Sequence, residues 1–215
     1  MPLLADRFNR ESELAAALLA AFARLRADLL AGKPDFFGFA SDVTAALRNS
    51  LAATFAAAGG WLAVEMAGTP TGGDGRITEA MLRTRGEAYA AGVAAALAMK
   101  IANDVRFGSA TMLPIGATDA QRQSSTAQLF TPARAQSIAI TETTRAISAG
   151  EDDVAALIAV ATQLAVTWFW EIEDERACDL CKELDGSERP GVQPPRHPGC
   201  RCRKRYAMKA LSGRI

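Results

Sequence analysis

The chain has 215 residues, of which 49% are hydrophobic, and its 24 basic and 24 acidic side chains leave no net charge at pH 7. This length and composition allow a buried core in one or two domains. The balanced charge argues against a protein that binds nucleic acid or membrane over its whole surface. The sequence does not open with a basic segment followed by a long apolar run, so we expect no secretory signal. We expect the protein to be made in a cytoplasm and to have no membrane contact.

Larger apolar residues recur at helical spacing through the first half of the chain. They fall on one face of each of three expected helices, over 11–30, from 42 to about 61, and over 77–105. The glycine pair at 59–60 favours an end of the second helix near that point. We therefore predict a helical N-terminal body over residues 1–107.

Two stretches are rich in Gly, Ser, Thr and Pro, which predicts irregular chain. The first, GTPTGGDG over 68–75, is interpreted as a loop. A phosphate-binding loop would need a preceding strand and a Lys-Ser/Thr pair, and this stretch lacks both. The second stretch, within 108–130, predicts a linker or arm before a C-terminal region over 131–215.

The C-terminal region begins with helical spacing and then changes its period. One helix is expected over 131–148, ending at Gly150, and another over 151–164. From 166 to 173 apolar and polar residues alternate, which predicts a strand. The predicted fold class is therefore mainly α, with a small β-containing zinc module over about 166–205.

All four cysteines and the single histidine lie close together near the C-terminal end of the sequence. Their pattern is Cys178-x2-Cys181, followed by His197-x2-Cys200-x-Cys202. A C-x2-C turn directs both sulfurs toward one point, as in a zinc knuckle, and the second group can supply the remaining ligands. Four of the five residues fill a tetrahedral site. We favour the four cysteines, with His197 in place of one of them as the alternative.

Such a closed site has a structural role, because protein atoms fill every position and leave none for a metal-bound water. The cofactor implied is thus a structural Zn²⁺ that does no chemistry. Two disulfides, four free thiols or a redox C-x2-C pair are the competing interpretations. The metal accounts for all five residues together, whereas the redox pair leaves the second group unexplained.

Charge is divided across this module, with acidic residues before the second ligand group and basic residues after it. The basic residues at its end are Arg201, Arg203, Lys204 and Arg205. One interpretation pairs them with the acidic half of the module. The other has them contact DNA phosphates or an acidic partner. The sequence leaves both interpretations open.

Two segments of the C-terminal region share their motifs with a known family. The first, over 135–150, reads AQSIAITETTRAISAG and centres on the pair Thr141-Glu142, followed by Arg145. The second, over 168–202, begins WFWEIEDERACDLCKELDG and ends PPRHPGCRC. Together they resemble the bacteriophage minor head, or head-morphogenesis, proteins related to protein F of phage Mu. These proteins have a similar helix, strand, C-x2-C, Leu-x-Gly and final His-Pro-x-Cys-Arg-Cys.

The resemblance implies a low-copy structural protein of a tailed-phage virion, in the head interior or at the portal vertex. It would act in head assembly, DNA packaging or early ejection. Its implied partners are the portal protein, the major capsid protein and packaged double-stranded DNA, with no small-molecule substrate and no catalytic residue. Ile140 departs from the family, in which a basic residue precedes the Thr-Glu pair.

Two other classes of function compete with this one. A zinc-ribbon nucleic-acid-binding protein would use the basic tail as its main contact. A toxin-type enzyme would use the lone histidine, or Glu142 and Arg145. These last two side chains are three residues apart on a helix, which favours a structural ion pair.

Overall fold

A computed structural model of the protein describes residues 2–67, 77–112, 116–173 and 177–209. The loop expected over 68–75 lies outside the described residues, apart from its flanks. The elements, in chain order, are α1 (Pro2–Leu30), α2 (Phe36–Ala67), α3 (Glu79–Met112), α4 (Asp119–Leu129), α5 (Pro132–Thr162), β1 (Ala165–Glu171), α6 (Asp179–Lys182) and β2 (Arg203–Lys209). The predicted fold class, mainly α with a small C-terminal sheet, is confirmed.

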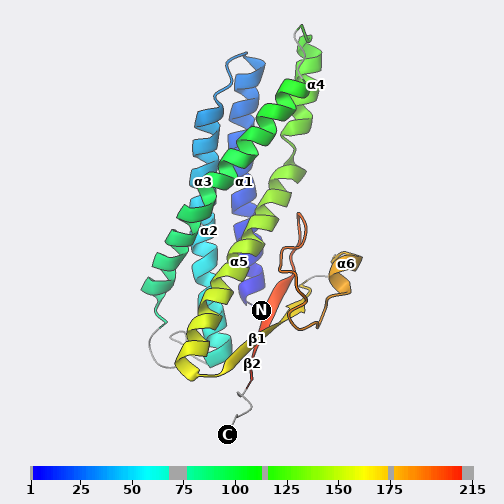
Figure 1. Cartoon of the computed structure of the whole chain (residues 1–215). Coiled ribbons are helices and arrows are strands. Elements are labelled where there is room, and N and C mark those ends of the chain that lie inside the picture. The colour runs from blue at the N-terminus through cyan, green and yellow to red at the C-terminus, as the bar shows by residue number, and fades with distance from the viewer. Residues whose placement is uncertain (1, 68–76, 113–115, 174–176, 210–215) are drawn as a thin grey trace.

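The long helices lie side by side along the molecule, and the small sheet lies at the end where α1 begins (Figure 1). α2 packs against α1, α3 and α5, while α5 also packs against α1. The predicted apolar stripes form the core, in which Leu18, Leu47 and Leu51 are fully buried. Each such leucine contributes about 1.5–3 kcal/mol through its removal from water.

Glycines inside the helices permit close helix packing and do not end the helices. α5 runs through Gly150 without interruption, so the predicted break between two helices at this position is wrong. A Cβ atom at Gly150 would lie 2.3 Å from the backbone oxygen of Phe55 on α2. The glycine is therefore needed where two helix backbones touch. α2 likewise continues past the glycine pair at 59–60 to Ala67.

The linker predicted over 108–130 is largely helical, which corrects that expectation. α3 continues to Met112, and α4 occupies Asp119–Leu129. The polar residues that suggested a linker include a capping box. The hydroxyl of Thr118 accepts a hydrogen bond from the Gln121 amide at 3.3 Å, and the Gln121 side chain accepts one from the Thr118 amide at 2.9 Å. Such residues favour helix ends as well as loops.

The two strands pair antiparallel, with Trp168 opposite Tyr206 and Phe169 opposite Arg205. The other edge of β1 is covered by the chain that follows α6, because the Trp170 amide donates to the Ser187 carbonyl oxygen at 2.9 Å. Both strands also contact α5, so the sheet joins the cysteine region to the bundle. Within the described ranges, no helix combines the length and apolar character needed to cross a membrane.

Candidate metal centre

The five predicted ligands come from two short segments that meet beside the sheet. Cys178 is the N-cap of α6 and Cys181 lies within that helix, so one helical turn presents both sulfurs. His197, Cys200 and Cys202 lie on the chain that leads into β2. The pairing of β1 with β2 brings the second segment back over the first, and all five side chains cluster as the sequence predicted.

The distances within the cluster are within about 0.5 Å of those between ligands of one metal ion. The Nε2 atom of His197 lies 3.1 Å from Cys178 Sγ and 3.3 Å from Cys181 Sγ, and Cys181 Sγ lies 3.9 Å from Cys200 Sγ. Around a tetrahedral zinc, bond lengths of about 2.3 Å to sulfur and 2.0–2.1 Å to nitrogen place neighbouring ligand atoms about 3.5–3.8 Å apart.

The cluster consists of two overlapping groups. Cys178, Cys181 and His197 form one, and Cys181, Cys200 and Cys202 form the other. Cys181 belongs to both groups, so it is the central ligand in either of the predicted sets. The geometry brings together five donors for four positions, and the choice between His197 and one cysteine stays open.

The histidine is oriented so that its Nε2 atom can bind a cation. Its Nδ1 atom lies 3.0 Å from the carbonyl oxygen of Pro198, to which an Nδ1–H group can donate. That tautomer leaves the lone pair on Nε2, which faces the cysteines. The Pro198 carbonyl is also the main cause of the raised pKa of His197.

Backbone amides favour the thiolate form at two of the cysteines. The Cys181 amide lowers the pKa of the Cys178 thiol. Hydrogen bonds from the Cys202 thiol, and then from the amides of Arg196 and Cys202, lower the pKa of Cys200 to about 5. Burial raises the pKa of Cys181 to about 12, and the bond to Cys200 raises that of Cys202. Metal binding would therefore release protons from these last two thiols.

The surroundings fit a small cation enclosed by protein. A cavity of about 60 Å³ lies among the ligands, and Cys181, Cys200 and Cys202 are buried around it. The buried ring of Trp170 packs against the same cluster. A donor set dominated by thiolate sulfur is typical of zinc among the common protein metals. The residues present therefore fit the predicted ion.

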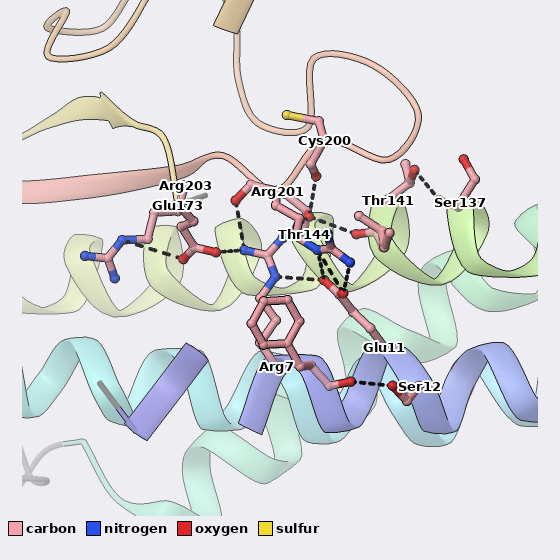
Figure 2. A network of polar contacts seen from close by, with 12 residues as sticks. Arg7, Glu11, Ser12, Ser137, Thr141, Thr144, Glu173, Cys200, Arg201 and Arg203 are labelled. Carbon is pink, nitrogen blue, oxygen red and sulfur yellow. Dashed lines mark hydrogen bonds and ion pairs between the residues drawn. The ribbon is translucent and has the colours of Figure 1, made fainter. Parts of the chain in front are cut away.

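The Thr-Glu motif helix lies directly against the ligand loop. On α5, the Thr141 hydroxyl accepts a hydrogen bond from the Gly199 amide at 2.9 Å, and the Thr144 hydroxyl lies 2.7 Å from the Cys200 carbonyl oxygen (Figure 2). Glu142 and Arg145 form the expected ion pair, and neither of them belongs to a ligand group. Burial raises the pKa of Glu142, while the charge of Arg145 opposes this shift.

A buried polar network that the sequence analysis missed joins α1 to the module (Figure 2). Arg7 is 2% exposed and donates hydrogen bonds to Glu11 at 2.9 Å and to Thr144 at 2.6 Å. It also donates to the Arg201 carbonyl oxygen at 2.9 Å and forms an ion pair with Glu173. In sequence, an arginine and a glutamate four apart on a helix resemble an ordinary surface pair. Nothing local marks them as buried.

The basic residues of the tail have very different environments. Arg203 and Lys204 are only 3% and 1% exposed, and they form ion pairs with Glu171 and Asp152, respectively. Arg201 pairs with Glu11 on α1 at 2.8 Å. The pair of Arg203 with Glu171 joins the tail to the acidic half of the module, whereas the partners of Arg201 and Lys204 lie on α1 and α5. Arg205 is exposed, with its guanidinium 4.9 Å from the centre of the Phe169 ring.

Comparisons of the chain with models of protein families, with curated proteins and with solved structures found no match. The resemblance to phage minor head proteins therefore stays a prediction from the motifs.

Proposed function

We propose that this protein is a structural minor capsid protein of a tailed bacteriophage, acting near the portal in head assembly, DNA packaging or early ejection. One observation carries the proposal beyond the sequence motifs. The two segments that resemble the family, 135–150 and 168–202, are packed against each other. The bonds from Gly199 to Thr141 and between Thr144 and Cys200 join them directly. This contact supports the view that the motifs belong to one inherited unit.

In this proposal the metal is a structural Zn²⁺ that holds the ligand loop against the end of β1. Four protein ligands leave no position for substrate or water, so the ion contributes folding free energy. The module is small and has only a two-stranded sheet, which is marginally stable by itself in water. A metal ion and the packing on α5 supply the stability that such a sheet lacks.

The competing function, a zinc-ribbon protein that binds nucleic acid through its basic tail, has less support. Contact between the tail and DNA phosphates would first require Arg203 and Lys204 to leave buried ion pairs. Breaking a buried pair costs about 3–5 kcal/mol. The salt-dependent gain from a phosphate contact would have to exceed this cost at each position.

Purified phage particles provide the test of the head-protein proposal. Quantitative mass spectrometry should find the protein in far fewer copies than the shell subunit. Chemical crosslinks should join its helices α1, α2 and α3 to the portal or capsid protein. Absence from particles, together with normal head formation after deletion of its gene, would refute the proposal. Elemental analysis of the purified protein tests the metal separately, with about one zinc per chain expected.

A further inference from the structure

α1 lies beside the segment that leads into β2 and carries two of the predicted metal ligands. Cys200 and Cys202 direct their sulfurs into the cluster, while the side chain of Arg201, between them, extends to α1. There its Nε and one terminal nitrogen donate to the same oxygen of Glu11, at 3.0 and 2.8 Å (Figure 2). A residue between two ligands in an extended segment points away from the metal. α1 therefore fixes that segment from behind.

Arg7 is the centre of this contact. One nitrogen of its guanidinium donates to the Arg201 carbonyl oxygen, and another donates to the Thr144 hydroxyl that also meets the Cys200 carbonyl. Arg7 thus holds the two peptide carbonyls on either side of Arg201, that of Arg201 directly and that of Cys200 through Thr144. It reaches this position from a site 194 residues earlier in the chain.

Burial makes this contact depend on the folded module. The side chains of Arg7 and Glu11 are each 1% exposed, so both charges have lost their hydration. That loss is compensated in part by their mutual ion pair on α1 and in part by their partners in the module, Glu173 and Arg201. A module that unfolds without its metal would leave both charges of α1 without these partners. Docking of α1 and metal binding therefore favour each other.

We infer that Arg7 is a positioning residue of the metal centre, and that docking of α1 and binding of the metal are one coupled event. The inference rests on the proposed zinc site and extends it to a helix that supplies no ligand. Because coupling between two binding equilibria is reciprocal, α1 strengthens zinc binding by the same factor by which zinc strengthens the docking of α1.

The zinc affinity of the full chain tests whether α1, through Arg7, strengthens metal binding. Titration of Zn²⁺ against a competing chelator should show affinity reduced about 10–100-fold in Arg7→Met, as is typical when a group that orients a ligand is lost. Arg10→Met is the matched control. Arg10 lies on the same helix and pairs with Asp6, so its replacement should leave zinc affinity unchanged. Co²⁺ bound in place of zinc should report altered thiolate geometry in Arg7→Met alone.

Hydrogen exchange tests whether zinc strengthens the docking of α1. Removing zinc from the wild-type chain and from Arg10→Met should speed amide exchange in the first turns of α1, whereas in Arg7→Met exchange there should already be fast and independent of zinc. Protection of α1 that does not respond to zinc in the wild type would overturn the inference. A folded Arg7→Met with wild-type zinc affinity would overturn it equally.

A milder variant covers the case in which Arg7→Met does not fold. Glu11→Gln keeps the shape of the side chain but removes the charge that Arg201 meets, so it should weaken zinc binding in the same direction and by less. Unchanged affinity in a folded Glu11→Gln would count against the coupling. A wild-type chain that binds no zinc would refute the metal centre itself. Zinc bound with equal affinity by the wild type and all variants would refute only the coupling to α1.

Discussion

Thr144 and Cys200 join the middle of a bundle helix to the ligand loop, with the Thr144 hydroxyl oxygen 2.7 Å from the Cys200 carbonyl oxygen. Both residues are buried, and the same hydroxyl accepts a hydrogen bond from Arg7 at 2.6 Å. A single hydroxyl on α5 thus connects the ligand loop with α1. Loss of this hydroxyl should therefore weaken the attachment of both the ligand loop and α1.

Replacing Thr144 by valine keeps the shape of the side chain and removes the hydroxyl. The change leaves buried polar groups on Arg7 and Cys200 without this partner, so the free energy of unfolding should fall by about 1–3 kcal/mol. Chemical denaturation of the zinc-loaded protein measures it. The control is Thr84→Val, at an exposed position where the hydroxyl donates only to the Ala80 carbonyl of its own helix. Equal losses in the two variants would contradict the argument.

Gly150→Ala should destabilise the bundle, because its Cβ would overlap the backbone oxygen of Phe55 and force α2 away from α5. The expected loss is about 1–3 kcal/mol, as for other overpacked cores. Gly92→Ala is the matched control within α3, where a Cβ meets nothing within 4 Å. Alanine there should stabilise the helix by about 0.5–1 kcal/mol. Thermal unfolding of both variants would show opposite shifts, and shifts of the same sign would contradict the prediction.

Cys181→Ser should remove the metal almost completely, because Cys181 is common to both ligand groups. Zinc content per chain should fall close to zero, and the module should become sensitive to protease. Of His197→Ala and Cys202→Ser, one should be much milder, since five donors compete for four positions. Equal and complete loss of zinc from both of these variants would refute the account of four ligands from five.

Stability should fall with rising pH through the titration of Glu151. This side chain is 0% exposed, neither of its carboxylate oxygens has a hydrogen-bond partner among the residues that the structure describes, and burial raises its pKa well above 4.5. The folded state therefore holds the proton more tightly than the unfolded state. Its contribution is complete below the unfolded pKa and is lost as pH rises through the raised pKa, with a slope of up to about 1.4 kcal/mol per pH unit. Glu151→Gln should lack this part of the slope in denaturation series at fixed pH values.

Glu188→Gln is the control, because the pKa of Glu188 is shifted in the opposite direction to that of Glu151. Hydrogen bonds from Lys209, and then from Thr167, lower the pKa of Glu188. Its stabilising effect should be present above the unfolded pKa and be lost as pH falls through the lowered one. The two substitutions should thus change the pH profile in different ranges. A profile of Glu151→Gln that matches the wild type throughout would show that Glu151 does not titrate as proposed.

The two arginines of β2 should respond very differently to substitution. Arg203→Met breaks a buried ion pair with Glu171 and removes the guanidinium that lies 4.5 Å from the centre of the Trp61 ring, so it should cost about 3–5 kcal/mol. Arg205→Met, at an exposed position, should change stability by less than about 0.5 kcal/mol. Denaturation measures both effects. If the tail also binds DNA, Arg205→Met alone should weaken that binding and flatten its salt dependence without unfolding the protein.

The sequence predicted those parts of the fold that depend on local spacing. The stripe through Leu18, Leu47 and Leu51 has helical periodicity, and β1 has a period of two, so both were recognised. The break expected at Gly150 was wrong because a glycine in sequence does not reveal the backbone of Phe55 that packs against it. The linker expected over 108–130 was wrong because capping residues and loop residues have the same composition.

The candidate site was predicted in a similar way. The cysteines and the histidine could be grouped because metal ligands in small modules lie at short, regular spacings. Arg7 and Glu11 could not be found, because their partners Glu173 and Arg201 lie at the opposite end of the chain. Long-range charge pairs have no periodic pattern, and only the fold brings them together.

The distance along the chain between Arg7 and its partners has a consequence for synthesis. The helix that carries Arg7 leaves the ribosome long before the module does, yet the carbonyl oxygen that Arg7 binds belongs to residue 201. Until that residue has emerged, Arg7 can pair with Glu11 and Thr144 but lacks its contacts with the module. A chain released too early therefore holds the start of α1 less firmly than the finished protein does. Quality control by proteases would then remove such truncated chains in preference to finished ones.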